Sequence, residues 1–177
     1  DEYIALFAIC GGVASALDKA SLKSAGDKMA LNELLFMVLI AGAFGGMISF
    51  YIVPALLRVT GKWIGGKGTY EELKIAYAWS SVPSAMALLF WFLQILLFGR
   101  EVFTSATPVI DASLSLTITM FIIGIIDIVL GCWIILIGFK CIAEAQRFSI
   151  WKAILNKVLA YAVVVVPVLL LVLILFQ

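Results

Sequence analysis

Asp127 has the most demanding surroundings in this chain, because it lies inside an uninterrupted apolar run, residues 114–139. An aspartate at the centre of a hydrocarbon layer costs about 2.5 to 3.5 kcal/mol on insertion scales, so we expect its carboxyl to face other helices. Two interpretations stay open: a proton or cation site, and a protonated acid that is hydrogen-bonded between helices as a structural element. Its predicted polar neighbours are Gln94, Ser80, Ser81, Asn156 and Tyr161.

Other catalytic chemistry is limited by composition. The chain has no histidine, which excludes Ser–His and Cys–His nucleophile pairs, histidine-ligated haem and most zinc sites. An intramembrane aspartyl protease needs two embedded aspartates, and Asp127 is the one that qualifies. Cys10 and Cys132 lie in apolar runs and are expected as small apolar side chains, whereas acylation is the alternative for Cys141. We therefore expect no catalytic residue, metal or cofactor, and no enzyme activity.

A glycine-rich segment partly matches a phosphate-binding loop. Gly61, Gly66 and Lys67 match its glycine and lysine positions, but Gly68 stands where serine or threonine would hold magnesium. No strand is expected before it. A flexible turn at the membrane interface, with lysines that meet anionic lipid headgroups, is the favoured interpretation.

The elements that hold these residues follow from composition and hydropathy. With 64% hydrophobic and 13% charged residues, the chain needs a lipid solvent. A crossing takes about 17 to 25 apolar residues. The predicted spans are 3–17, 34–57, 82–98, 114–139 and 158–176. The first is not typical of a signal peptide, because acidic residues precede it. We predict an all-α, polytopic membrane protein with residues 1–177 in a single domain, a bundle of five transmembrane helices with short interfacial helices.

The basic residues predict the orientation. Eight of the twelve lysines and arginines lie in the interfacial segments 58–81 and 140–157. The positive-inside rule then places these segments in the cytoplasm, the N-terminus inside and the C-terminus outside. A multi-pass protein of the inner or plasma membrane is expected.

Both interfacial segments contain signals for a helix start. Thr69 and Glu72 form a capping-box pattern that predicts a helix from Tyr70, and Pro83 then begins the next span. Ser149 and Pro167 repeat this scheme, which indicates either a weak parallel repeat or the general preference of membrane helices for caps and aromatic anchors. The residues predicted to face lipid or a partner here are Arg58, Lys62, Lys67, Tyr70, Lys74, Arg147, Trp151 and Lys152.

Spaced glycines predict close helix packing. Gly42 and Gly46 form a GxxxG notch, and Gly124, Gly131 and Gly138 recur every seven residues along the helix of Asp127. A compact bundle is expected.

The run from Gly68 to Lys74, continued through 76–78 to Pro83, resembles the central signature of the Yip1 family of membrane proteins. The second half adds Trp133, Leu136, Phe148, Ser149, Lys152 and Ala153. The resemblance covers residues 34–176 and implies five spans with a cytoplasmic N-terminus. Eukaryotic members carry an Asp-Leu-Tyr-Gly-Pro segment, bind Rab-type GTPases and act in vesicle traffic. That segment is absent, so the chain resembles the prokaryotic branch and GTPase binding is not carried over.

Two classes of function follow. The favoured one is a non-enzymatic scaffold or adaptor whose basic, aromatic loops engage anionic lipid headgroups or a membrane-protein partner, with a homo-oligomer expected and no nucleic acid. The alternative is a small ion or solute channel or transporter in which Asp127, Ser115, Thr117 and Thr119 line a path. Positions 115 and 119 share a helix face while 117 turns away, which weakens the second class.

Overall fold

The computed structural model describes residues 2–175, and its regular elements within that range are all helical. In chain order they are α1 (Glu2–Leu22), η1 (Ala25–Asp27), α2 (Leu31–Trp63), α3 (Tyr70–Ser80), α4 (Val82–Phe98), η2 (Gly99–Phe103), α5 (Pro108–Asp111), α6 (Leu114–Gln146) and α7 (Ile150–Leu175). Five segments are long and apolar enough to cross a membrane: Tyr3–Leu22, Leu31–Trp63, Tyr70–Phe103, Leu114–Gln146 and Ile150–Leu175. The predicted all-α membrane bundle is confirmed.

The helices extend beyond the predicted apolar runs. α2 continues to Trp63 and α6 to Gln146, so each helix includes charged residues beyond its predicted apolar run. A helix satisfies its own backbone hydrogen bonds in the interfacial layer as it does in the hydrocarbon, so it does not have to end where the hydrocarbon ends. The connecting loops are consequently short, and they bring helix ends together.

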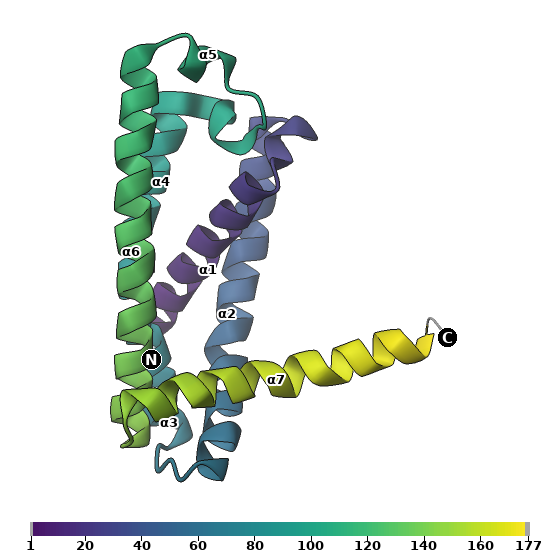
Figure 1. The fold of residues 1–177 in the computed structure, drawn as a ribbon, viewed down its shortest axis with the longest axis vertical. Coiled ribbons are helices and arrows are strands. Elements are labelled where there is room, and N and C mark those ends of the chain that lie inside the picture. Colours follow the sequence, from purple (N-terminus) through teal and green to yellow (C-terminus); the bar gives the residue numbers. More distant parts are fainter. Residues whose placement is uncertain (1, 176–177) are drawn as a thin grey trace.

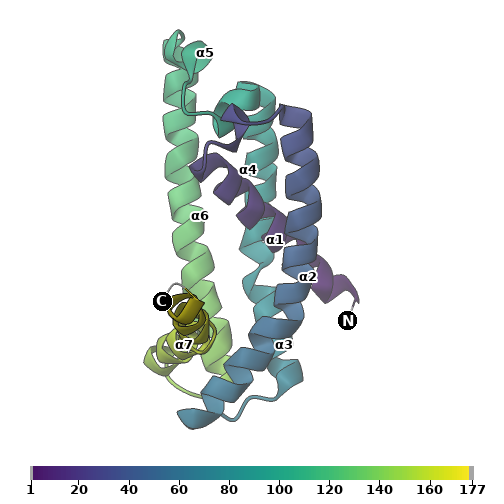
Figure 2. The ribbon, with the colours of Figure 1, turned by 90° about the vertical axis from the view of Figure 1, so that its right-hand side faces the viewer.

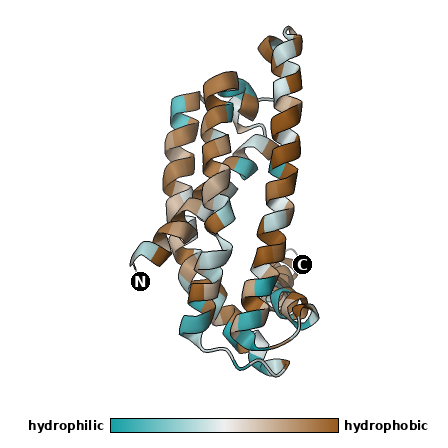
Figure 3. Ribbon diagram, turned by 90° about the vertical axis from the view of Figure 1, so that its left-hand side faces the viewer, coloured by the Kyte–Doolittle hydropathy of each residue, from teal (hydrophilic) through white to brown (hydrophobic). Residues whose placement is uncertain are grey.

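The long helices α2, α4 and α6 run along the main axis of the molecule, α1 crosses them obliquely, and α7 leaves the bundle at a steep angle (Figures 1 and 2). The loops 64–69 and 147–149 lie at the same end of the bundle. We call this the basic end, defined by the last turn of α2, the loop 64–69, the start of α3, the end of α6 and the start of α7. Hydrophilic segments gather at this end, while most of the long helices are hydrophobic (Figure 3).

The seam between α1 and α2 is made by glycine. A Cβ placed on Gly42 would lie 2.6 Å from Val13 Cα, and one on Gly12 or Gly46 would collide with the backbone of the facing helix. The two backbones therefore touch, which only glycine permits at these positions.

The largest buried cluster lies toward the other end. It centres on Leu34, Phe103 and Trp91, of which the last two stack with ring centroids 5.5 Å apart. The indole N–H of Trp91 donates to Asp18 at 2.9 Å and so joins α4 to α1.

Helix α7 packs only through its first half. Its buried residues are Ala153, Asn156 and Ala160, whereas every residue from Val163 to Leu175 is exposed. Within the described residues, about three turns of apolar helix are thus largely exposed.

Candidate functional site

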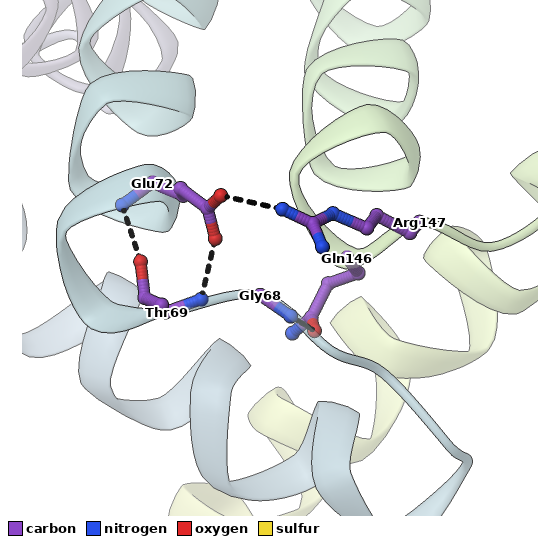
Figure 4. A network of polar contacts seen from close by, with 5 residues as sticks. All are labelled: Gly68, Thr69, Glu72, Gln146 and Arg147. Atoms are coloured by element: carbon purple, nitrogen blue, oxygen red, sulfur yellow. Dashed lines mark hydrogen bonds and ion pairs between the residues drawn. The ribbon is translucent and has the colours of Figure 1, made fainter.

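A buried polar junction at the basic end centres on Gln146, the last residue of α6. Its side chain is 1% exposed, its amide donates from Nε2 to the Leu57 carbonyl at 2.8 Å, and its Oε1 accepts from the Gly68 N–H at 3.1 Å. Its own carbonyl accepts from the Lys67 N–H at 3.1 Å. One residue therefore connects α6 to α2 and to the loop before α3 (Figure 4).

Three glycines make room for this amide. A Cβ on Gly61 or Gly66 would overlap the Gln146 side chain, and one on Gly68 would lie 2.7 Å from the Ala145 carbonyl oxygen. Gly65 adds a φ of +87°, a left-handed conformation that favours glycine. The spacing that looked like part of a phosphate loop is explained by close packing on Gln146.

A second buried pair lies beside the first. The Thr60 hydroxyl donates to Asn156 Oδ1 at 2.6 Å, and the Asn156 amide donates to the Leu57 carbonyl at 3.2 Å; both side chains are fully buried. Leu57 O therefore accepts from side chains of both α6 and α7. A buried amide that lost its partner would cost about 1 to 3 kcal/mol, so this arrangement holds α2, α6 and α7 in one geometry.

The start of α3 is capped and tied to α6. Thr69 N–H donates to Glu72 at 2.8 Å, and Glu72 N–H donates to the Thr69 hydroxyl at 3.2 Å, so the predicted capping box is confirmed. The free carboxylate oxygen of Glu72 accepts from Arg147 at 3.0 Å (Figure 4). Arg147 is the left-handed residue that ends α6, with a φ of 57°.

The predicted basic surface divides into free and engaged residues. Arg58, Lys62, Lys67 and Trp151 are exposed. Lys152 is also exposed, and its ammonium donates to the Ile64 carbonyl at 3.3 Å.

Lys74 and Tyr70 are not free. Lys74 pairs with Glu71 at 3.5 Å and lies over the rings of Phe50 and Tyr51, and its side chain is only 13% exposed. The Tyr70 hydroxyl donates to the Tyr51 carbonyl at 3.2 Å. These two residues attach α3 to α2.

Of the predicted neighbours of Asp127, Gln94 is the one placed against it. Gln94 Nε2 donates to Asp127 Oδ2 at 3.0 Å, which joins α4 to α6. Ser80 and Ser81 both donate to the Tyr77 carbonyl, and Asn156 belongs to the junction. Tyr161 is 64% exposed. The structure thus brings Gln94 to Asp127, while the other predicted neighbours lie elsewhere in the bundle.

The glycines of α2 and α6 also have different surroundings. Gly42 and Gly46 touch α1, but no described atom lies within 4 Å of a Cβ placed on Gly124 or Gly131, and Gly138 faces only the Lys157 ammonium at 3.9 Å.

Gln146 and Thr60 are the junction residues that sequence reasoning missed. A polar residue at a helix end is usually solvated, so neither attracts attention by type. The signal available was the crowding of glycines at 61, 66 and 68, because closely spaced glycines indicate that another group approaches the backbone.

Comparison with known proteins gives one finding. The family model described as the Yip1 domain matches residues 3–176. No curated protein matches. No solved structure matches either.

Proposed function

We propose that this chain, which belongs to the Yip1 family of multi-spanning membrane proteins, is a non-enzymatic membrane adaptor whose basic end docks an acidic segment of a partner protein. The observation that carries this proposal is the Gln146 junction, which ties the loop at Lys67 and Gly68 to α2 and α6.

The charges at the basic end leave a positive surplus. Residues 58–81 and 140–157 hold eight lysines and arginines but only three glutamates. Two of those glutamates, Glu71 and Glu72, pair with Lys74 and Arg147. Arg58, Lys62 and Lys67 are exposed and make no ion pair within residues 2–175. A surface of this kind attracts a negatively charged ligand.

Rigidity favours a folded or extended protein partner over headgroups alone. Lysines that only meet lipid reach the headgroup layer through their flexible side chains, and their backbone position matters little. Here the loop backbone is held by Gln146 through both Lys67 and Gly68, and glycines are required around it. A fixed arrangement of charges supports recognition of one shape.

The transport alternative finds less support in the contacts. Asp127 is hydrogen-bonded to Gln94, and the hydroxyls of Thr117 and Thr119 donate to backbone carbonyls one turn earlier in the chain, those of Ser113 and Ser115. These groups are engaged with one another and with the backbone, so they favour a structural role.

The test is charge reversal at the basic end. Lys62→Glu together with Lys67→Glu is expected to reduce recovery of the cross-linked partner from native membranes by about tenfold, while Lys23→Glu with Lys28→Glu, at the opposite end, leaves it unchanged. Gln146→Met keeps every charge and is expected to lower recovery as well, because the loop is released.

Equal recovery with both double variants would contradict the proposal. If recovery is unchanged but binding of the purified chain to anionic liposomes falls with Lys62→Glu and Lys67→Glu alone, the basic end is a lipid anchor instead.

A further inference from the structure

A cavity of about 450 Å³ lies between helices α1, α2, α3, α4, α6 and α7, and Leu57 of the junction contributes to its wall. Its wall contains many polar groups. Five serines contribute, among them Ser15 from α1, Ser49 from α2 and Ser84 from α4, together with Tyr77, Tyr161 and Lys157. Asp127 does not line it.

Lys157 carries the one charge in this wall. Its ammonium lies 5.2 Å from the centre of the Phe139 ring and 3.9 Å from a Cβ placed on Gly138, so it turns back toward α6 and not toward the loops. Gly138 and Phe139 end the apolar run 114–139, about 12 Å along the helix from Gln146, which places the ammonium at the edge of the apolar part of the bundle.

Among the described residues, this ammonium has no counter-charge. No carboxylate lies among the residues that line the cavity, and no ion pair of Lys157 exists within residues 2–175. A lysine held between membrane helices near the interface usually faces a water-filled cavity, an opposite charge or a lipid headgroup. Ser80 and Ser81 donate to the Tyr77 carbonyl, so the remaining hydroxyls of the wall surround a single cation, and the cavity has the electrostatics of an anion site.

An apolar groove continues from the cavity. It has a volume of about 230 Å³ between α2 and α7 and shares Val53, Leu57, Lys157 and Tyr161 with the cavity. Its remaining wall is aliphatic, with Ile52, Leu56, Ala160, Val164 and Val165. Since α7 is exposed beyond Tyr161, the groove opens sideways to the lipid.

We propose that the cavity binds the phosphate group of an anionic membrane phospholipid through Lys157 and the surrounding hydroxyls, with an acyl chain in the groove between α2 and α7. Inorganic phosphate shares the first part of this chemistry but has nothing to fill the groove. The site uses none of the exposed cations of the basic end, so either proposal can fail without the other.

The first test removes the charge. The thermal stability of the purified chain is followed by tryptophan fluorescence in a neutral detergent, while phosphatidylglycerol, phosphatidylcholine or inorganic phosphate is added. Phosphatidylglycerol alone is expected to raise Tm. Lys157→Gln should weaken its apparent affinity about tenfold and Lys157→Arg should retain it, while Lys140→Gln, which removes an exposed cation of α6, should have no effect.

The second test fills the cavity. Because Lys157 Nζ is the nearest atom to a Cβ on Gly138, Gly138→Leu projects into the site without meeting the backbone of another helix. Gly131→Leu, one heptad earlier, makes the same chemical change where no described atom lies within 4 Å. Gly138→Leu is expected to abolish the phosphatidylglycerol effect and Gly131→Leu to preserve it.

An equal rise in Tm with phosphatidylcholine, an equal rise with inorganic phosphate at the same concentration, or equal losses in Lys157→Gln and Lys140→Gln would each overturn the proposal. A Tm that instead follows protein concentration and dimer formation would show that a second copy of the chain covers the groove, which also overturns the lipid assignment.

Discussion

Helices α2 and α6 have the same length, 33 residues, and both carry spaced glycines in an apolar sequence, yet they are packed in opposite ways. On α2, Gly42 and Gly46 touch the backbone of α1. On α6, no described atom lies within 4 Å of a Cβ placed on Gly124 or Gly131, and an open apolar groove of about 440 Å³ runs past Gly124. Spaced glycines thus show where a helix can be approached closely, but whether a partner arrives depends on the rest of the fold.

The firm connection of α6 to α2 lies at the basic end, and it is polar. Gln146 and Asn156 both donate to the carbonyl of Leu57. Bare backbone contact holds α2 to α1, while buried amides hold it to α6 and α7. In lipid, where the hydrophobic effect between helices is absent, these are two of the available means of helix association.

The largest effect is expected for substitutions that compare the glycines of α2 with those of α6. Gly46→Leu should destabilise the chain by about 3 kcal/mol, because its side chain must push α1 away from α2. Gly124→Leu, with open space around it, should change stability by no more than about 0.5 kcal/mol. Unfolding in one detergent compares them, and equal losses would show that α6 is packed against a partner outside this chain.

The next largest loss of stability is expected at the Gln146 junction. Gln146→Leu leaves the Gly68 N–H and one lone pair of the Leu57 carbonyl without their side-chain partner, so a loss of about 2 kcal/mol is expected. Glu144→Leu is the control, since that side chain is exposed near the same helix end. Hydrogen exchange at Gly68 should accelerate in the first variant alone; unchanged protection would mean that the loop is held by other contacts.

A smaller effect separates the cap of α3 from its ion pair with α6. Thr69→Ala removes the hydroxyl that accepts from Glu72 N–H and should cost about 1 kcal/mol. Arg147→Gln removes only an exposed ion pair and should cost no more than about 0.5 kcal/mol. Thermal unfolding measures both, and the reverse order would show that the link to α6 matters more than the helix start.

The smallest effect concerns the middle of α6. Asp127→Asn keeps a polar partner for Gln94, so stability should shift by less than about 1 kcal/mol, and proton or ion flux into liposomes should stay at the level of the unchanged chain. Asp127→Leu is the comparison, because it removes the hydrogen-bond acceptor of Gln94. A loss of flux in Asp127→Asn would instead support the transport alternative.

Local patterns predicted the elements well. The apolar runs predicted five helices able to cross a membrane, and Thr69 with Glu72 predicted the start of α3 at Tyr70, because both depend on residues close together in the chain. The predicted runs 34–57 and 114–139 were shorter than α2 and α6, since hydropathy marks the hydrocarbon layer and not the helix end.

The site was harder to predict. Asn156 was expected beside Asp127, but it lies at the junction with Thr60, and Lys74 was expected on the free surface, but it lies over Phe50 and Tyr51. Both placements depend on how helices rotate and cross, which residue type alone does not specify. The Gln146 contacts join residues 78 and 89 positions apart, beyond the reach of any local pattern.

By itself, the sequence determined that the chain needs a lipid environment, the number of helices able to cross a membrane, and the concentration of positive charge in two interfacial segments. Each of these depends on the transfer energy or charge of individual residues and short segments. The tertiary structure alone decided which glycines are in contact, which amide holds the basic end, and where Lys157 points. Those outcomes depend on the contacts between helices, in which a rotation of one residue, about 100°, exchanges a buried side chain for an exposed one.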